Sequence, residues 1–283
     1  MTGFEAARHG ISRRRSDLKQ ALKWSAAAAD RLRPTVGGVV VLIYHRVGGE
    51  SGLELDLTIA RFADQMAWLA DTGIVITLDE ALRELEVDRK DHSSRIVVTF
   101  DDGTADFVEH AIPVLAQYGI PATLYLATEF VDRSLPLPYG APPVSWAGLR
   151  DAMAGGLLTI GSHTHSHALL DRLAPSEIAR ELDVSRELIE RELGVKAVHF
   201  AYPKALPGSP AAEAAVRERF RSAALAGTHP NRFGATDPFR LARSPVQSSD
   251  GMRWFQAKAN GGLALEDRAR RTINRVRHRD AST

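Results

Sequence analysis

The chain has 283 residues, of which 44% are hydrophobic and 25% are charged, the composition of a globular protein with a sizeable core. Its 36 basic and 35 acidic residues nearly cancel, which excludes the strongly basic field typical of a nucleic-acid-binding protein. No cysteine is present, so disulfides and thiolate metal sites are excluded, and any metal must be bound by imidazole and carboxylate groups.

The first 35 residues predict a basic amphipathic helical extension. Apolar residues recur there at helical spacing, at Leu18, Leu22, Ala26, Ala29 and Leu32. We expect this helix to pack on the outside of the domain, with docking to a partner or peripheral contact with a membrane as the alternative. The segment lacks the apolar stretch and cleavage site of a secretory signal, and no later run approaches the roughly 20 apolar residues that span a bilayer. The sequence therefore predicts a cytoplasmic protein without an integral membrane segment.

From residue 36 onward, short apolar runs alternate with helical patterns, as in parallel strands joined by crossover helices. The predicted strands are 39–45, 74–77, 95–100, 122–127, 157–162, 197–202, 222–226 and, with the weakest pattern, 239–246. Seven or eight such strands predict an α/β fold with a closed barrel, in a single domain over residues 36–250, followed by a helical segment over 251–283. The proline-rich stretch 135–143 predicts a loop over the rim. In such barrels the chemistry lies on loops that leave the carboxyl ends of the strands.

Two adjacent carboxylates follow the predicted strand 95–100. The strand runs into Asp101 and Asp102, and Gly103 permits a tight turn directly after them. Because adjacent side chains diverge, one carboxylate can bind a metal while the other faces the water on that metal. Alone the pattern is weak, since Asp-Asp-Gly is also a common turn or helix cap.

Three histidines in five residues follow the predicted strand 157–162. His163 and His167 are four residues apart and can converge on one ion if the chain turns as it leaves the strand, in which case His165 points elsewhere. Two imidazoles and one carboxylate leave open positions for water and substrate, as in a catalytic metal site.

These two motifs together resemble those of the polysaccharide deacetylase family, the carbohydrate esterases related to chitin oligosaccharide and peptidoglycan deacetylases. The sequence Thr-Phe-Asp-Asp-Gly at 99–103 and the sequence His-Thr-His-Ser-His at 163–167 carry the resemblance, which covers roughly residues 36–250. The resemblance implies a distorted (β/α) barrel. It also implies Asp101 as the general base, with Asp102, His163 and His167 as ligands of zinc or a similar divalent ion.

The third motif of the family, of the type Arg-Pro-Pro-Tyr, has only a partial counterpart at residues 200–204. Ala201 occupies the arginine position, and Lys204 occupies the tyrosine position. The family's arginine steadies the base aspartate, and Arg243 is a candidate for the missing cation, with a surface arginine as the alternative. Tyr202 either packs at the strand end or lies beside backbone N–H groups that could bind an oxyanion.

The family's late Leu-x-His motif, which supplies the general acid, is absent after residue 246. The sequence Leu-Ile-Tyr-His-Arg-Val at 42–47 resembles the first-strand element of the poly-N-acetylglucosamine deacetylase branch, in which the pattern is circularly permuted. The resemblance makes His45 the candidate general acid, and the first and last strands of a barrel are neighbours. The alternative is a buried structural histidine.

The combined prediction is a metal-dependent hydrolase that removes N-acetyl or O-acetyl groups from a carbohydrate. Tyr139, Trp146 and Tyr202 are candidate aromatic platforms for sugar rings, although Trp146 at a helix start also fits packing in the core. Two alternatives stay open: a carbohydrate-binding protein on a weakened deacetylase scaffold, and hydrolysis of another amide or an ester by the same metal centre.

Overall fold

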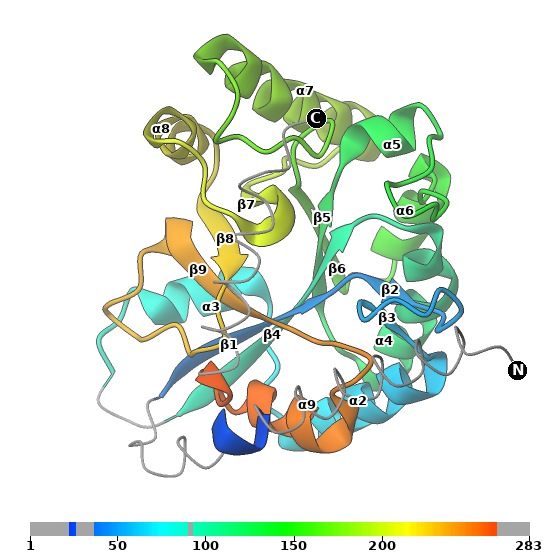
Figure 1. Ribbon diagram of the computed structural model, residues 1–283, viewed down its shortest axis with the longest axis vertical. Helices are drawn as coiled ribbons and strands as arrows, with labels where there is room; N and C mark the ends of the chain where they lie inside the picture. Colours follow the sequence, from blue (N-terminus) through cyan, green and yellow to red (C-terminus); the bar gives the residue numbers. More distant parts are fainter. Residues whose placement is uncertain (1–22, 27–36, 90–92, 265–283) are drawn as a thin grey trace, which may run out of the picture.

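The computed structural model describes residues 23–26, 37–89 and 93–264, and its centre is a closed barrel of parallel strands (Figure 1). The strands in barrel order are β1 (Gly38–Tyr44), β4 (Ser94–Asp102), β5 (Ala122–Leu126), β6 (Leu158–Ser162), β7 (His199–Ala201), β8 (Ser222–Ala226) and β9 (Leu241–Pro245). The barrel closes where β9 pairs with β1. The predicted α/β barrel is confirmed, with seven strands.

Helices cover the outside of the barrel, and sequence signals place several of their ends. They are α2 (Ile59–Thr72), α3 (Leu78–Leu85), α4 (Ile112–Tyr118), α5 (Thr128–Asp132), α6 (Trp146–Met153), α7 (Pro175–Leu193), α8 (Pro210–Arg219) and α9 (Gly251–Ala259), with a π-helical turn η1 (Phe107–Ala111) and two short 3₁₀ turns, η2 (Pro203–Ala205) and η3 (Pro238–Arg240). Thr77 and Glu80 form a capping box at the start of α3. Gly73, Gly119 and Gly194 cap α2, α4 and α7 in the left-handed conformation.

The predicted strand 74–77 is not a barrel strand. Only Val75 pairs there, as an isolated bridge to Ile96 near the start of β4. From Val98 onward that edge of β4 is occupied by β5, so the short apolar run finds no further backbone partners. A two-stranded sheet of β2 (Arg46–Val47) and β3 (Asp56–Leu57) lies outside the barrel.

Two predicted segments lie largely outside the described residues. Of the amphipathic helix over 1–35, only residues 23–26 are described, and they are helical. Of the segment 251–283, α9 is helical and residues beyond 264 are not described. No helix in the described part of the chain is long and apolar enough to cross a membrane.

Side-chain alternation along the strands separates two layers of the core. Val41 and Val97 belong to a cluster in the barrel interior, whereas Leu42 and Phe100 pack in the layer between the barrel and helices. The same alternation carries Asp101 to the interior side of β4. The strand pattern thus places a carboxylate inside the barrel at its carboxyl end.

Candidate active site

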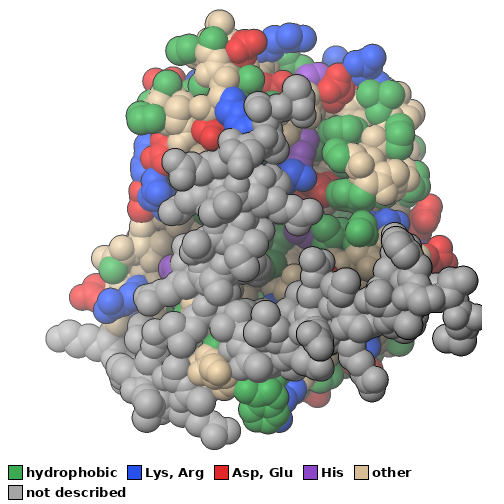
Figure 2. All heavy atoms as spheres, viewed as in Figure 1, with side chains coloured by type: hydrophobic (Ala, Val, Ile, Leu, Met, Phe, Trp, Pro, Cys, Tyr) green, Lys and Arg blue, Asp and Glu red, His purple; other side chains and the backbone are tan. Residues whose placement is uncertain are grey.

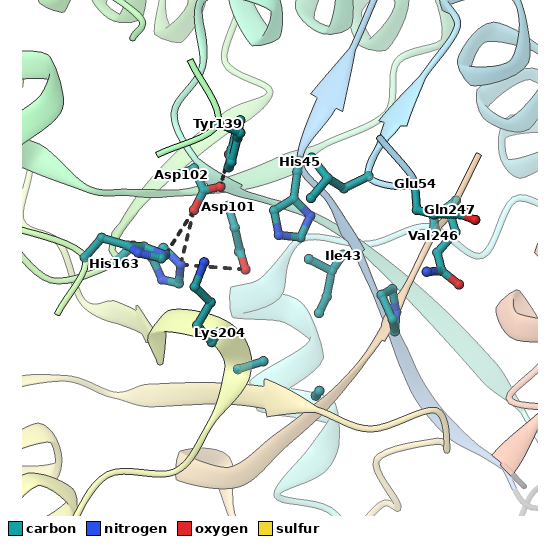
Figure 3. Close-up of a pocket in the computed structure, with 15 residues that line it drawn as sticks. Ile43, His45, Glu54, Asp101, Asp102, Tyr139, His163, Lys204, Val246 and Gln247 are labelled. Atoms are coloured by element: carbon teal, nitrogen blue, oxygen red, sulfur yellow. Dashed lines mark hydrogen bonds and ion pairs between the residues drawn. The ribbon is translucent and has the colours of Figure 1, made fainter. Parts of the chain in front are cut away.

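A cavity of about 290 Å³ opens among the carboxyl ends of the strands. His45 after β1, Asp101 and Asp102 at the end of β4, and His163 and His167 after β6 all line it. Figure 3 shows His45, Asp101, Asp102 and His163 turned towards this cavity. The structure therefore brings together the predicted base, the predicted acid and the three predicted metal ligands.

The register of the barrel explains why residues so far apart in sequence meet. Tyr44 of β1 lies beside Phe100 of β4, so the next residues, His45 directly after β1 and Asp101 near the end of β4, are at the same level. On the other side of β4, Asp102 is level with Leu126 of β5, which in turn is level with the last residue of β6. The segment that carries the histidines therefore begins one residue beyond Asp102.

Asp101 is bound by an arginine from β9, which is separated from β4 only by β1 in the barrel. Arg243 Nη1 and Nη2 donate to its two carboxylate oxygens at 2.6 and 2.8 Å, and Nη1 also lies 3.2 Å from Thr99 Oγ1. Both partners are buried, with Arg243 fully inaccessible. Burial alone would raise the pKa of Asp101, but the charge of Arg243, with that of a protonated His163, more than offsets it and holds the pKa below its usual range. The carboxylate is thus kept ionised inside the protein.

Asp102, His163 and His167 form a compact group of potential metal ligands. One ligand atom from each lies within 4.8 Å of the others. Asp102 Oδ1 is 3.6 Å from His163 Nε2 and 3.4 Å from His167 Nε2. Asp102 has a φ of 76°, so the backbone turns at the end of β4 and its carboxylate does not simply follow the strand alternation. Gly103 follows with φ 92°, and a Cβ there would lie 2.4 Å from Leu126 Cδ1, which explains the glycine.

The hydrogen bond of His163 Nδ1 leaves Nε2 available to bind a metal. Its Nδ1 lies 2.8 Å from the carbonyl oxygen of Ala201, which fixes the proton on Nδ1 and leaves the Nε2 lone pair facing Asp102 and His167. Burial lowers the pKa of His163 to about 4, so the ring is neutral at neutral pH. A neutral imidazole is the form that binds a metal.

Glu181 of α7 holds the segment that carries the two histidines. Its carboxylate accepts hydrogen bonds from the backbone N–H groups of His165 and Ser166 at 3.0 and 2.8 Å, and from Ser166 Oγ at 2.8 Å. The segment needs such support because Thr164 and His167 both adopt left-handed backbone conformations, with φ of 65° and 61°. The side chain of His165 turns away from the ligand group and pairs with Thr128, as predicted from its position in the motif.

Tyr139 reaches the same group from the predicted rim loop. Its hydroxyl donates a hydrogen bond to Asp102 Oδ2, which leaves Oδ1 directed at the two histidines. Burial and the neighbouring Asp102 carboxylate raise the pKa of Tyr139 well above its usual value, so the hydroxyl keeps its proton. The structure thus gives this residue a polar contact in addition to the aromatic platform expected from sequence.

Comparison with known proteins finds similar sequences and a similar fold. The polysaccharide deacetylase family model matches residues 88–221. YxkH of Bacillus subtilis, named as a polysaccharide deacetylase, is 29% identical over 164 residues, 58% of this chain and 55% of that protein. The poly-beta-1,6-N-acetyl-D-glucosamine N-deacetylase of Staphylococcus epidermidis is 26% identical over 192 residues, 62% of this chain and 64% of that protein. The structure of IcaB from Ammonifex degensii shares 27% identity with a TM-score of 0.68, covering 80% of this chain and 97% of that one. The chain is therefore similar to the polysaccharide deacetylase family over residues 88–221.

The chain spans little more than half the length of YxkH and less than two thirds of the staphylococcal deacetylase. The arginine that the deacetylase pattern places at position 201 is replaced here by Ala201, which faces the barrel interior. Arg243 of β9 supplies a cation to the aspartate from another strand. The alternative of a surface arginine is wrong, because the side chain is completely buried.

Besides Arg243, two predicted site residues lie outside the cavity lining. Tyr202 is buried against Phe200, with ring centroids 5.0 Å apart, and its backbone N–H donates to the carbonyl of Ala224 at 3.1 Å, so that donor is not available to an oxyanion. Ala201 points into the barrel, and strand alternation therefore turns Tyr202 to the outer layer. Trp146 begins α6 and packs against the outer core, which agrees with the core-packing alternative.

Among the lining residues that were not predicted as site residues, three have polar side chains that matter for the site. Lys204 stands at the rim, and Figure 3 shows its side chain directed towards Asp101 and His163. Glu54 and Gln247 lie on the His45 side of the cavity. Gln247 comes two residues after β9, so the strand-end rule that found the aspartates and histidines could also have found it. Glu54 lies in the connection between β2 and β3, and no sequence pattern indicates that this connection reaches the cavity.

Proposed function

We propose that this protein is a metal-dependent deacetylase that removes acetyl groups from an N-acetylated carbohydrate. The observation that carries the proposal is the position of Asp101 beside the Asp102, His163 and His167 group in one cavity, 4.0 Å from His163 Nε2. A carboxylate held ionised by a buried arginine next to three ligands supplies both a base and a metal site. This combination suits amide hydrolysis, because water is a weak nucleophile at neutral pH and both a base and a bound ion would activate it.

Zinc is the ion that we propose for this site. Two imidazole nitrogens and one carboxylate oxygen are ligands that zinc favours, and three protein ligands leave positions for water and substrate. When bound, the ion supplies a Lewis acid that polarises the acyl oxygen and lowers the pKa of a coordinated water towards about 7. The hydrogen bonds that Ala201 and Glu181 accept, and the one that Tyr139 donates, orient the ligands or the segment that carries them.

Asp101 accepts the proton of the attacking water in this proposal. Its two bonds to Arg243 hold the carboxylate in one orientation, and each oxygen retains a lone pair for the incoming proton. The lowered pKa ensures that the base is ionised at neutral pH. Arg243 therefore acts as a positioning residue, since it contacts the base and does not line the cavity.

His45 donates a proton to the departing amine in this proposal. It is half-buried, lines the cavity, and directly follows β1 at the level of Asp101 in β4. An amine is a poor leaving group until it is protonated, so a second acid–base group is needed in addition to Asp101. Within the cavity lining, His45 is the imidazole outside the ligand group.

The substrate class that we propose is a polymer or oligomer of N-acetylglucosamine. The staphylococcal relative is named for action on poly-beta-1,6-N-acetyl-D-glucosamine, and it is similar over 62% of this chain. The cavity is open at the barrel rim and combines apolar residues such as Leu55 and Val246 with the polar residues Glu54 and Gln247. Such a lining suits a sugar ring, which has apolar faces and hydroxyl edges.

Acetate release by the purified protein tests this proposal. We expect release from β-1,6-linked N-acetylglucosamine oligomers that depends on added zinc and stops in a chelator, together with about one zinc per chain. His163→Ala should lose the zinc while it retains the fold by circular dichroism. O-acetylated sugars and a simple acetanilide serve as the competing substrates.

The two alternatives make different predictions in the same assay. A carbohydrate-binding protein would bind the oligomers without releasing acetate in the presence of zinc. A hydrolase of another amide or ester would act faster on the competing substrates than on the oligomers. Either result would overturn the assignment, as would full activity in protein shown to be free of metal.

A further inference from the structure

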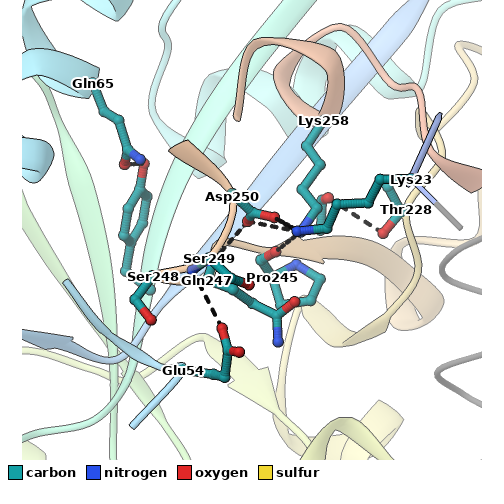
Figure 4. Close-up of polar contacts among 12 residues, drawn as sticks. Lys23, Glu54, Gln65, Thr228, Pro245, Gln247, Ser248, Ser249, Asp250 and Lys258 are labelled. Atoms are coloured by element: carbon teal, nitrogen blue, oxygen red, sulfur yellow. Dashed lines mark hydrogen bonds and ion pairs between the residues drawn. The ribbon is translucent and has the colours of Figure 1, made fainter. Parts of the chain in front are cut away.

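Three charged residues are buried together behind one wall of the cavity (Figure 4). Lys23 Nζ lies 2.7 Å from Asp250 Oδ1, and Lys258 Nζ lies 2.9 and 2.8 Å from the two oxygens of the same carboxylate. The three side chains are at most 1% exposed. Lys23 is 227 positions away from Asp250 in sequence, so this cluster joins the described N-terminal turn, 23–26, to the end of the barrel domain.

The cluster also holds the backbone of the cavity wall. Asp250 Oδ2 accepts a hydrogen bond from the backbone N–H of Gln247 at 2.7 Å, and Lys258 Nζ donates to the carbonyl of Pro245 at 2.9 Å. Pro245, Val246 and Gln247 all line the cavity. Two of the three consecutive wall residues are therefore fixed through their backbone by the buried charges.

The other side of the same loop is fixed by a residue that itself lines the cavity. The carbonyl of Glu54 accepts from the backbone N–H of Ser248 at 2.7 Å, and its carboxylate accepts from that of Ser249 at 3.3 Å. The loop 245–250 is thus held between the buried cluster and the β2–β3 excursion (Figure 4). Its conformation depends on polar contacts at both sides, which makes it sensitive to the loss of either.

Burial of two ammonium groups and one carboxylate carries a large desolvation cost, so the cluster by itself is weak evidence for added stability. A buried ionic group has a better-attested use in fixing one geometry. Here the geometry that it fixes is the position of the Gln247 backbone, whose side chain lies on the His45 side of the cavity. The leaving sugar must pass this side if His45 protonates it.

We propose that Lys23 and Lys258 act through Asp250 as positioning residues for Gln247, and that the Gln247 amide binds a hydroxyl of the carbohydrate. The N-terminal turn is thereby part of the support of the substrate site. The substrate half of this inference rests on the proposed function. The positioning half rests only on the contacts of the loop.

Hydrogen exchange of the full-length protein tests the positioning half without substrate or metal. Lys23→Met leaves the Asp250 and Lys258 pair charge-balanced, so the protein should fold. We expect the amides of Gln247 to Asp250 to exchange about tenfold faster in this variant, because their anchor is loosened. Lys196→Met, at an exposed lysine far from the loop, should match the wild type. Lys258→Met removes the other cation and should act in the same way.

A double-mutant cycle tests the substrate half. Gln247→Ala should raise KM for the oligomer about threefold or more with little change in kcat. This corresponds to an interaction free energy at the lower end of the range for groups in contact. Lys23→Met should raise KM similarly, and Lys23→Met combined with Gln247→Ala should be no worse than Gln247→Ala alone. Bound zinc should be unchanged in all three.

The outcomes separate the two proposals. Unchanged exchange of the loop amides in both lysine variants would overturn the positioning role whatever the enzyme does. Additive KM effects of the Lys23 and Gln247 substitutions, or an unchanged KM in Gln247→Ala, would overturn the substrate role. A wild-type protein that releases no acetate would instead refute the proposed function, while the exchange experiment would still decide the positioning role.

Discussion

Arg243→Met separates the contribution of the buried cation from that of the carboxylate that it holds. The substitution removes both hydrogen bonds to Asp101 and leaves a carboxylate with only 4% of its side chain exposed and no arginine beside it. Methionine fills much of the arginine stem volume, so the change acts mainly on charge. Solvent screening gives little relief at such a site.

The expected cost is about 3–5 kcal/mol, the range for removing one partner of a buried ion pair. At roughly 2–4 °C per kcal/mol for a domain of this size, Tm should fall by roughly 6–20 °C in metal-free protein at pH 7. Arg240→Met is the matched control, because Arg240 lies 2.7 Å from Glu213 in a pair that is exposed to solvent. That pair should contribute little, on the order of 0–1 kcal/mol.

The pH dependence has a definite sign. In the wild type the folded-state pKa of Asp101 is lowered, so its stabilisation is present above the unfolded-state pKa and is lost as pH falls through the folded-state pKa. Without Arg243, burial raises the pKa of Asp101, so the variant carries a penalty at neutral pH that is relieved on acidification. The gap in Tm between the two proteins should therefore narrow between about pH 7 and pH 4.

Thermal unfolding across this pH range, with a chelator present, measures the effect. Combining Arg243→Met with Asp101→Asn should recover much of the lost stability, since no unpaired charge remains, but should not recover turnover. The reasoning fails if Arg243→Met is no less stable than Arg240→Met, or if the Tm gap stays constant from pH 7 to pH 4. In the active enzyme, the acidic limb of the pH–rate profile should move to higher pH in Arg243→Met.

The other site residues give three further predictions. Asp101→Asn should keep its zinc and lose about 10²–10⁴-fold in kcat, whereas Asp102→Asn should lose zinc affinity itself; equal loss of metal in both, measured by elemental analysis, would contradict the division of roles. His45→Ala should keep metal and fold but lose the alkaline limb of the pH–rate profile on an amide substrate, with a smaller loss on an ester; equal losses on both with a lower Tm would make His45 structural. Tyr139→Phe should weaken zinc binding by about 10- to 100-fold in a competition titration because Asp102 loses an orienting hydrogen bond, whereas Tyr118→Phe, on the outer core, should not; equal affinities would remove the role of Tyr139.

The barrel was predictable because each of its strands is a short apolar run between helical patterns. Each run can be recognised from the local sequence alone. The error at 74–77 has a different origin. Those residues have the composition of a buried strand, but β5 occupies the neighbouring edge of β4 from Val98 onward. Competition between segments for one strand edge depends on the tertiary structure and leaves no mark in the local sequence.

The aspartates and histidines that line the candidate site were predictable because they lie at or soon after strand ends, where a barrel gathers its functional groups. Residues that act through them were harder to find. Glu181 lies in the middle of α7 among other charged residues, and nothing in its surroundings indicates that it binds the histidine segment. The predicted site role of Tyr202 was wrong for a simpler reason. Side chains alternate along a strand, so Tyr202 points outwards because Ala201 points inwards.

The arginine that binds Asp101 comes from a different strand than the deacetylase pattern predicts. A deacetylase pattern places that arginine on the strand of Ala201, whereas Arg243 comes from β9. Both positions face the same interior, and the small side chain at position 201 leaves room there for the long side chain of Arg243, whose guanidinium carbon lies 5.0 Å from the ring centroid of Tyr125. The chemistry requires a bidentate cation on the carboxylate, not a particular strand. The motif on the strand of Ala201 therefore lacks its arginine, although Arg243 supplies that cation in the folded protein.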